Sequence, residues 1–104
     1  KNKSTSVIFQ PLLFSRTRDF MEDFATILSK FDEVYLLDIY PAREKPIDGV
    51  NSQVLLEKIS SSKKEIINKE LINDIIINSK TEVISILGAG NITENLNKKI
   101  FTND

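Results

Sequence analysis

The chain of 104 residues contains neither cysteine nor histidine. A disulfide framework is therefore excluded, and so are metal sites built from thiolate or imidazole ligands. For the same reason this chain supplies no cysteine nucleophile and no histidine general base. The absence of cysteine is compatible with a reducing compartment, and we expect a cytoplasmic protein.

Long apolar runs and blocks of like charge are also missing. No run approaches the roughly 20 apolar residues that a membrane-spanning helix needs, so we expect no membrane partner. The formal net charge is −1, whereas a nucleic-acid-binding face needs clustered basic residues to displace counterions from phosphates. We therefore expect no nucleic-acid partner.

Length and composition allow a single small domain. Apolar residues make up 40% of the chain and charged residues 28%, a balance typical of a folded globular protein rather than a disordered one. A chain of this length buries enough surface for one core and little more, so we expect one domain over residues 1–104. The opening residues, KNKS, contain neither an initiator Met nor the apolar core of a signal peptide. The simplest interpretation is a segment of a longer polypeptide.

Short apolar segments at residues 6–10, 33–39 and 82–87 predict three buried strands. The continuous apolar run within 33–39 is typical of a parallel strand covered on both faces. Residues 65–67 predict one brief additional strand.

Helical periodicity separates or follows these strands. The first helix begins near Ser15 or Thr17, either of which can cap it. Asn51 or Ser52 can cap a short second helix, and Asn68 begins a third. The side chains expected to face inward are Phe20, Phe24, Ile27, Leu28 and Phe31 in the first helix, Leu55, Leu56 and Ile59 in the second, Leu71, Ile72, Ile75 and Ile76 in the third, and Ile92, Leu96 and Ile100 in a fourth.

Strands that alternate with helices imply right-handed crossovers and a parallel sheet between two helical layers. The predicted fold class is therefore α/β, a three-layer Rossmann-like domain with a mainly parallel sheet. In such a sheet, ligands bind beyond the carboxyl ends of the strands. Three loops, at 10–17, 38–50 and 88–91, reach that edge, which we call the rim.

The first rim loop carries Arg16 and Arg18 at the start of a helix. Unpaired backbone N–H groups and the helix dipole favour an anion there, and a guanidinium holds a carboxylate with two parallel hydrogen bonds. A basic residue in the first turn opposes the dipole by about 0.3–1 kcal/mol, so an acidic group is expected nearby. Two interpretations stay open: an anion clamp for a carboxylate or phosphate, or exposed arginines that pair with neighbouring acids.

The other two rim loops carry weaker signals. Residues 38–50 form a connection too long for a plain strand-to-helix link, and Arg43, Glu44 and Lys45 within it either contact a ligand or partner or form an ordinary exposed charge cluster. The third loop, GAGNIT at 88–93, matches only part of a dinucleotide-binding pattern and predicts a tight turn with close helix–strand packing. No GxxxxGK(S/T) segment is present, so this chain alone does not form an ATP site.

Taken together, the three loops resemble one family. VIFQPLLFSRTRD at residues 7–19 is similar to the pattern FQPH-R/L-Y/F-S/T-RTRD of the UDP-N-acetylmuramate–L-alanine ligases. DIYPAREKPIDGVNS at residues 38–52 resembles that family's D-V/I-Y-x-A-x-E-x-P-I-x-G, and GAGNI at residues 88–92 resembles its GAGDI. The three segments occur in the family's order and are spread over most of the chain.

The resemblance implies the C-terminal, amino-acid-binding domain of a three-domain enzyme of peptidoglycan synthesis. In such an enzyme an N-terminal domain binds the UDP-sugar, a central P-loop domain binds ATP and Mg²⁺, and L-alanine attacks an acyl phosphate formed on UDP-N-acetylmuramate. By analogy Arg16 binds the alanine carboxylate, with Ser15 and Gln10 beside it and Arg43 as a further substrate-binding candidate. The resemblance assigns no catalytic residue, cofactor or metal to this chain, which is expected to be inactive alone.

Two departures from the family pattern accompany the resemblance. Leu12 stands where the family usually has histidine, and Leu13 stands where arginine is frequent. The family's DDY-x-HHP segment, which opens this domain, is missing before residue 1, so we expect an uncovered apolar edge and self-association. The alternative function is a non-catalytic α/β module that recognises a carboxylate ligand or a partner protein.

Overall fold

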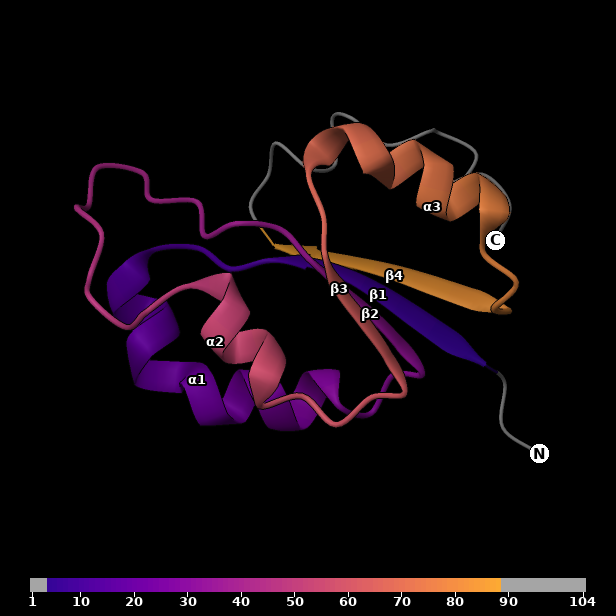
Figure 1. The fold of residues 1–104 in the computed structure, drawn as a ribbon, viewed down its shortest axis with the longest axis horizontal. Helices are drawn as coiled ribbons and strands as arrows, with labels where there is room; N and C mark the ends of the chain where they lie inside the picture. Colours follow the sequence, from indigo (N-terminus) through magenta and orange to yellow (C-terminus); the bar gives the residue numbers. More distant parts are fainter. Residues whose placement is uncertain (1–3, 89–104) are drawn as a thin grey trace.

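The computed structural model describes residues 4–88 of the chain (Figure 1). The strands are β1 (Thr5–Gln10), β2 (Glu33–Leu36), β3 (Lys63–Ile66) and β4 (Val83–Gly88), and the helices are α1 (Phe14–Leu28), α2 (Ser52–Glu57) and α3 (Ile72–Asn78), with a short 3-10 turn η1 (Lys69–Leu71) directly before α3. None of the helices between residues 4 and 88 has the length and hydropathy of a membrane-spanning segment.

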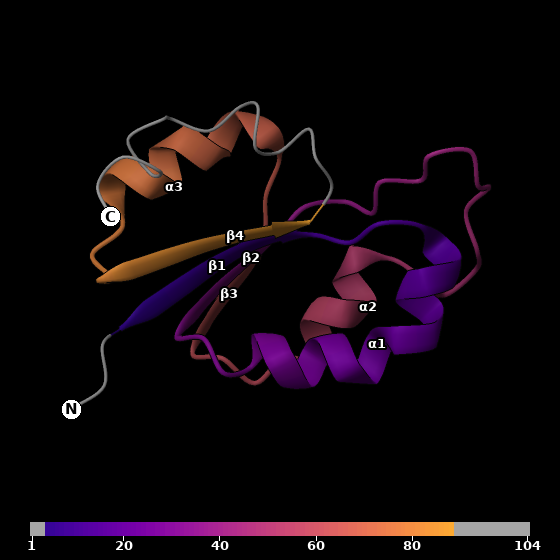
Figure 2. The ribbon, with the colours of Figure 1, turned by 180° about the vertical axis from the view of Figure 1, so that it is seen from behind.

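The four strands form one parallel sheet in the order β3-β2-β1-β4. Helices α1 and α2 lie on one face, and α3 lies on the other (Figures 1 and 2). The reversal of direction after β3 accounts for this, because right-handed crossovers in opposite directions place their helices on opposite faces. The predicted three-layer α/β architecture is confirmed.

The predicted strands are confirmed with small shifts in their bounds, but β4 has no buried residue although a buried strand was predicted there. β2 ends at Leu36 rather than at residue 39, but the Leu37 N–H still donates to the Phe9 carbonyl at 2.9 Å. β3 begins two residues earlier than predicted, at Lys63, and is an edge strand with mostly exposed side chains. Its apolar signal is short because three of its four side chains are exposed.

Two apolar clusters hold the layers together. The face beneath α1 and α2 buries side chains that include Val7, Val34 and Leu36, and the face beneath α3 buries Ile8 and Tyr35 among others. Neighbouring positions of β1 and β2 thus serve opposite faces, as the alternation of side chains along a strand requires. Central strands covered on both faces read as continuous apolar runs for this reason.

The predicted inward face of α1 is wrong in part. Phe20 is 48% exposed and Ile27 is 50% exposed, although Leu28 is buried as predicted. The buried positions are instead Thr17, Met21, Ala25 and Leu28. The side chains that face the core are thus offset around the helix from the predicted aromatic stripe.

The helix starts also differ from the predictions in part. The predicted capping of α2 by Asn51 is confirmed, because its Oδ1 accepts the Val54 N–H at 2.9 Å. α1 begins at Phe14, preceded by Leu13 with φ +68 and no side-chain cap, and the Thr17 hydroxyl donates to the Leu13 carbonyl instead of capping. Asn68 precedes η1 without a capping hydrogen bond, and α3 itself begins at Ile72. The fourth helix lies outside the described residues.

Candidate substrate-binding rim

Backbone hydrogen bonds join the first two rim loops side by side. The Tyr40 N–H donates to the Pro11 carbonyl, and the Leu13 N–H donates to the Tyr40 carbonyl, both at 2.8 Å. Leu12 and Tyr40 form an isolated parallel bridge between these bonds. The pairing of β1 with β2 therefore continues past the sheet, and the predicted meeting of these two loops at the rim is confirmed.

Gln10 lies under this junction at the carboxyl end of β1. Its side chain donates from Nε2 to the Asp38 carbonyl at 3.0 Å, which ties the end of β1 to the start of the second loop. Its Oε1 is buried and accepts no hydrogen bond from residues 4–88. An unsatisfied buried acceptor costs about 1–3 kcal/mol. The candidate residue Gln10 therefore has a structural bond on one side and an open acceptor on the other.

Gly88 at the end of β4 comes close to the same residue. It pairs with Gln10 in the sheet and has φ +126, and a Cβ atom there would lie 2.4 Å from the Gln10 carbonyl oxygen. Only glycine fits such an approach without a backbone shift. This close approach joins two strands, β4 and β1; the predicted tight turn at 88–91 and its helix–strand packing involve residues after 88, which lie outside the described residues.

The start of α1 holds a carboxylate from the second loop. Glu44 Oε1 accepts the Ser15 N–H at 2.9 Å, and the Ser15 hydroxyl donates to Glu44 Oε2. These hydrogen bonds, with smaller contributions from the Phe14 N–H and the charge of Arg18, lower the pKa of Glu44. The acidic group that the dipole argument requires is therefore present within the chain itself.

The predicted site residues separate into two groups around this contact. Gln10 and Ser15 already have partners within the chain, and Ser15 gives both of its donors to Glu44. Arg16 and Arg43 are exposed, and neither forms an ion pair with residues 4–88. Arg18 pairs with Asp19 at 2.9 Å, and this hydrogen bond and charge raise its pKa. The interpretation of arginines as surface ion-pair residues therefore holds for Arg18.

The amino-acid sequence places Glu44 in a charge cluster at 43–45 but does not predict its contact with the start of α1. The signal was weak: α1 has no capping side chain at Leu13, and a carboxylate lies in a long loop far along the sequence.

Two non-glycine residues of the same region, Leu13 at φ +68 and Ala42 at φ +52, adopt left-handed backbone conformations. Such conformations are costly and persist where surrounding contacts hold them, often at functional sites.

A small pocket of about 280 Å³ opens at the rim between the starts of α1 and α2. Its lining includes Phe14, Ile39 and Ser52, and the Ser52 hydroxyl donates to the Leu37 carbonyl at 2.6 Å. None of the four predicted site residues lines it. The pocket is therefore adjacent to the residues predicted to bind substrate rather than formed by them.

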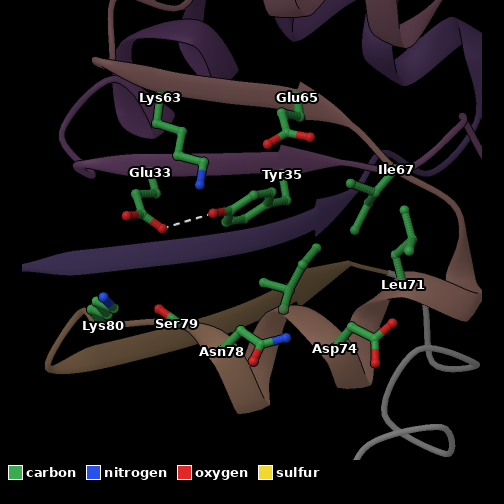
Figure 3. A pocket seen from close by; sticks show the side chains of 11 residues that line it. Glu33, Tyr35, Lys63, Glu65, Ile67, Leu71, Asp74, Asn78, Ser79 and Lys80 are labelled. Atoms are coloured by element: carbon green, nitrogen blue, oxygen red, sulfur yellow. Dashed lines mark hydrogen bonds between the residues drawn. The ribbon is translucent and has the colours of Figure 1, made fainter.

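A larger pocket of about 410 Å³ lies between α3 and the part of the sheet formed by β2 and β3 (Figure 3). Tyr35 on its floor donates to Glu33 Oε1 at 2.7 Å, and Ser6 donates to the same oxygen at 3.2 Å. Burial first, and the hydrogen bond to Glu33 second, raise the pKa of Tyr35. This phenol is therefore a hydrogen-bond donor within a satisfied network and not a base.

No cluster of three or more potential metal ligands occurs among residues 4–88.

Comparison with known proteins gives the family. No protein-family model matches the chain. Curated UDP-N-acetylmuramate–L-alanine ligases do: that of Christiangramia forsetii is 54% identical over 97 residues, which cover 93% of this chain and 22% of the relative. Those of Flavobacterium psychrophilum and Parabacteroides distasonis are 50% and 52% identical, over 89% and 82% of this chain and 21% and 18% of their own lengths. The chain belongs to this ligase family. It spans about a fifth of the length of the curated relatives it matches.

The family assignment agrees with the sequence resemblance and gives the rim geometry its context. The first two segments that resemble the family's signatures, residues 7–19 and 38–52, are the loops joined by the Tyr40 hydrogen bonds and the Glu44–Ser15 contact. Leu12, which replaces the family's usual histidine, is 37% exposed at that junction. This departure from the family pattern therefore lies at the rim.

Proposed function

We propose that residues 1–104 form the C-terminal, amino-acid-presenting domain of a longer ATP-dependent UDP-N-acetylmuramate–L-alanine ligase. Its rim would position L-alanine for attack on the acyl phosphate of UDP-N-acetylmuramate. The observation that carries the proposal is that the two family-like loops meet at one rim, with Arg16 exposed in the first turn of α1. The names of the relatives support the substrates, since each is called a UDP-N-acetylmuramate–L-alanine ligase.

Arg16 is the residue we assign to the alanine carboxylate. A guanidinium holds a carboxylate through two parallel hydrogen bonds, and this geometry fixes the direction in which the amine points. Side chains in a helix lean toward its N-terminus, so Arg16 is directed to the rim end of α1. Holding the amine and the acyl phosphate in line can lower the activation barrier by about 7–11 kcal/mol. Arg43 adds a second positive charge from the neighbouring loop.

ATP and Mg²⁺ do not fit the residues of this chain. The sequence has no phosphate-binding GxxxxGK(S/T) segment, and residues 4–88 hold no cluster of metal-ligand side chains. We therefore derive no step of ATP activation from these residues. The nucleotide, its metal and the UDP-sugar belong, in our proposal, to a central and an N-terminal domain of the same protein, and the isolated chain is inactive.

The test uses the full-length protein in an assay for alanine addition that depends on both ATP and UDP-N-acetylmuramate. We expect activity in the wild type and, for Arg16→Ala, a KM for L-alanine raised by about tenfold or more, because a charge-assisted bidentate contact is lost. Arg18→Ala is the matched control, since Arg18 already pairs with Asp19. An unchanged KM in Arg16→Ala would refute the role of Arg16.

The same assay separates the enzyme from the alternative function. A non-catalytic carboxylate-binding module would bind L-alanine in equilibrium dialysis but would form no product with ATP and UDP-N-acetylmuramate. That outcome would overturn the ligase proposal while leaving the rim as a binding site.

A further inference from the structure

The two exposed arginines of the rim come from different loops and are joined through their chain neighbours. Ser15 directly precedes Arg16, and Glu44 directly follows Arg43. The hydrogen bonds from the Ser15 N–H and hydroxyl to the Glu44 carboxylate connect these neighbours across 29 positions of sequence. Because consecutive Cα atoms lie about 3.8 Å apart, this contact determines how far the two arginines can separate.

We propose that Glu44 is a positioning residue that clasps the 38–50 loop to the first turn of α1 and so brings Arg43 and Arg16 to one carboxylate site. The inference rests on the proposed function, since it concerns how the same rim holds the amino-acid substrate. Glu44 itself does not touch the substrate in this arrangement. It acts through Ser15 and the backbone of α1.

The clasp is the contact that holds the far part of the loop. The Tyr40 backbone bonds fix the beginning of the 38–50 loop to residues 11–13, and the Glu44 N–H donates to the Pro41 carbonyl at 2.9 Å within the loop itself. Among residues 4–88, the hydrogen bonds that tie residues 41–46 to α1 all go to the Glu44 carboxylate, mainly from Ser15 with a smaller contribution from the Phe14 N–H. Without the Glu44 carboxylate the loop that carries Arg43 loses its attachment to the helix.

The clasp also decides which groups remain for a ligand carboxylate. The backbone N–H of Ser15 and its hydroxyl already donate to Glu44, so a carboxylate of the chain occupies the N-terminal end of α1. A substrate carboxylate is then left to the exposed guanidinium groups, which bind it in a fixed planar geometry. Oriented binding by two arginines, rather than diffuse attraction by a helix end, is what an aligned amine requires.

The test compares Glu44→Ala, Glu44→Gln and Ser15→Ala in the full-length protein, with Glu70→Ala as the matched control. Glu70 is exposed on η1, and its side chain forms no hydrogen bond or ion pair within the described range. We expect Glu44→Ala to raise the KM for L-alanine about tenfold with kcat changed less than about threefold, because uniform substrate binding is lost. Glu44→Gln keeps one acceptor oxygen and should recover about half of that loss on a logarithmic scale.

Two further measurements separate positioning from general damage. The double variant Ser15→Ala/Glu44→Ala should be no worse than Glu44→Ala, because both substitutions remove one interaction. Amide hydrogen exchange should become faster at Ser15 and across residues 38–48 in Glu44→Ala and remain at the wild-type rate in Glu70→Ala. This second measurement needs no catalysis.

Each contrary result overturns the clasp. An unchanged or lowered KM for L-alanine would mean that Glu44 is irrelevant or competes with the substrate. Equal rises in the KM for L-alanine, ATP and UDP-N-acetylmuramate would mean that the substitution damages the fold. If the wild type adds no alanine, the proposed function fails, and the exchange experiment still decides the clasp: unchanged exchange at Ser15 refutes it.

Discussion

Gly88 and Gln10 are paired across β4 and β1 so closely that a single added methyl group on Gly88 would lie 2.4 Å from the Gln10 carbonyl oxygen. The Gln10 side chain in turn donates to the Asp38 carbonyl, so three elements that are far apart in the sequence meet at this point of the rim. The carboxyl end of β4, the end of β1 and the start of the second loop therefore share one packing constraint.

Gly88→Ala should destabilise the chain by roughly 2–4 kcal/mol, because it combines a left-handed backbone conformation with a clash against backbone. Gly49→Ala is the control: Gly49 has φ +79 but no atom lies within 4 Å of a Cβ built there. The control should cost only about 1–2 kcal/mol, from backbone strain alone. Urea unfolding measures both, and equal losses would show that the contact with Gln10 is unimportant.

The exposed aromatic flank of α1 should make the isolated chain associate. The ring centroids of Phe20 and Phe24 lie 6.2 Å apart, and those of Phe24 and Phe9 lie 5.4 Å apart. Phe9 pairs in the sheet with Leu87 of β4, which is 41% exposed. An apolar surface of this kind is buried by association when no other segment covers it. We expect sedimentation to show concentration-dependent dimers.

The double variant Phe20→Ser/Ile27→Ser should shift that equilibrium to monomer. Ile77→Ser is the control, because Ile77 is 69% exposed on α3, on the opposite face of the sheet. If the control abolishes association as effectively as the double variant, the flank of α1 is not the interface. A wild-type chain that stays monomeric at high concentration would contradict the prediction altogether.

The lowered pKa of Glu44 predicts how stability depends on pH. A carboxylate whose pKa is lower in the folded state stabilises the fold above its usual pKa of about 4.3, and this contribution is lost as the pH falls through the lowered value. We expect the wild type to have a higher Tm than Glu44→Gln near neutral pH and the two to converge in acid. Thermal unfolding followed by circular dichroism tests this, and Glu70→Gln serves as the control. A difference in Tm that stays constant from neutral to acid pH would show that the charge of Glu44 is not responsible.

Tyr35 should titrate late at alkaline pH. Burial and its hydrogen bond to Glu33 raise its pKa above the usual value of about 10. The raised pKa stabilises the fold fully below the usual value, and this contribution is lost as the pH rises through the folded-state value. Phenolate absorbance should therefore show one of the two tyrosines ionising only as the chain unfolds, and Tyr35→Phe should remove that late signal. Early, reversible ionisation of both tyrosines would contradict it.

Local patterns were sufficient for the order of elements and for the parallel sheet. Apolar runs at 33–39 and 82–87 predicted buried strands. β2 is buried, because a strand covered on both faces has no polar side to show, whereas β4 lies at the edge of the described sheet and has no buried residue. The capping of α2 by Asn51 was equally readable, since that bond spans only three positions. Side-chain periodicity failed for α1, which has two adjacent apolar stripes, and only packing against the sheet selects one of them.

The rim shows the same division. That Gln10, Ser15, Arg16 and Arg43 belong to strand-end loops followed from the amino-acid sequence alone, because parallel strands place such loops along one edge. Which of these groups already have partners was decided by the tertiary structure: Gln10 binds Asp38, and Glu44 reaches Ser15 from 29 positions away. Hydrogen bonds of that separation depend on how loops close in space, and that closure leaves no local pattern in the order of residues.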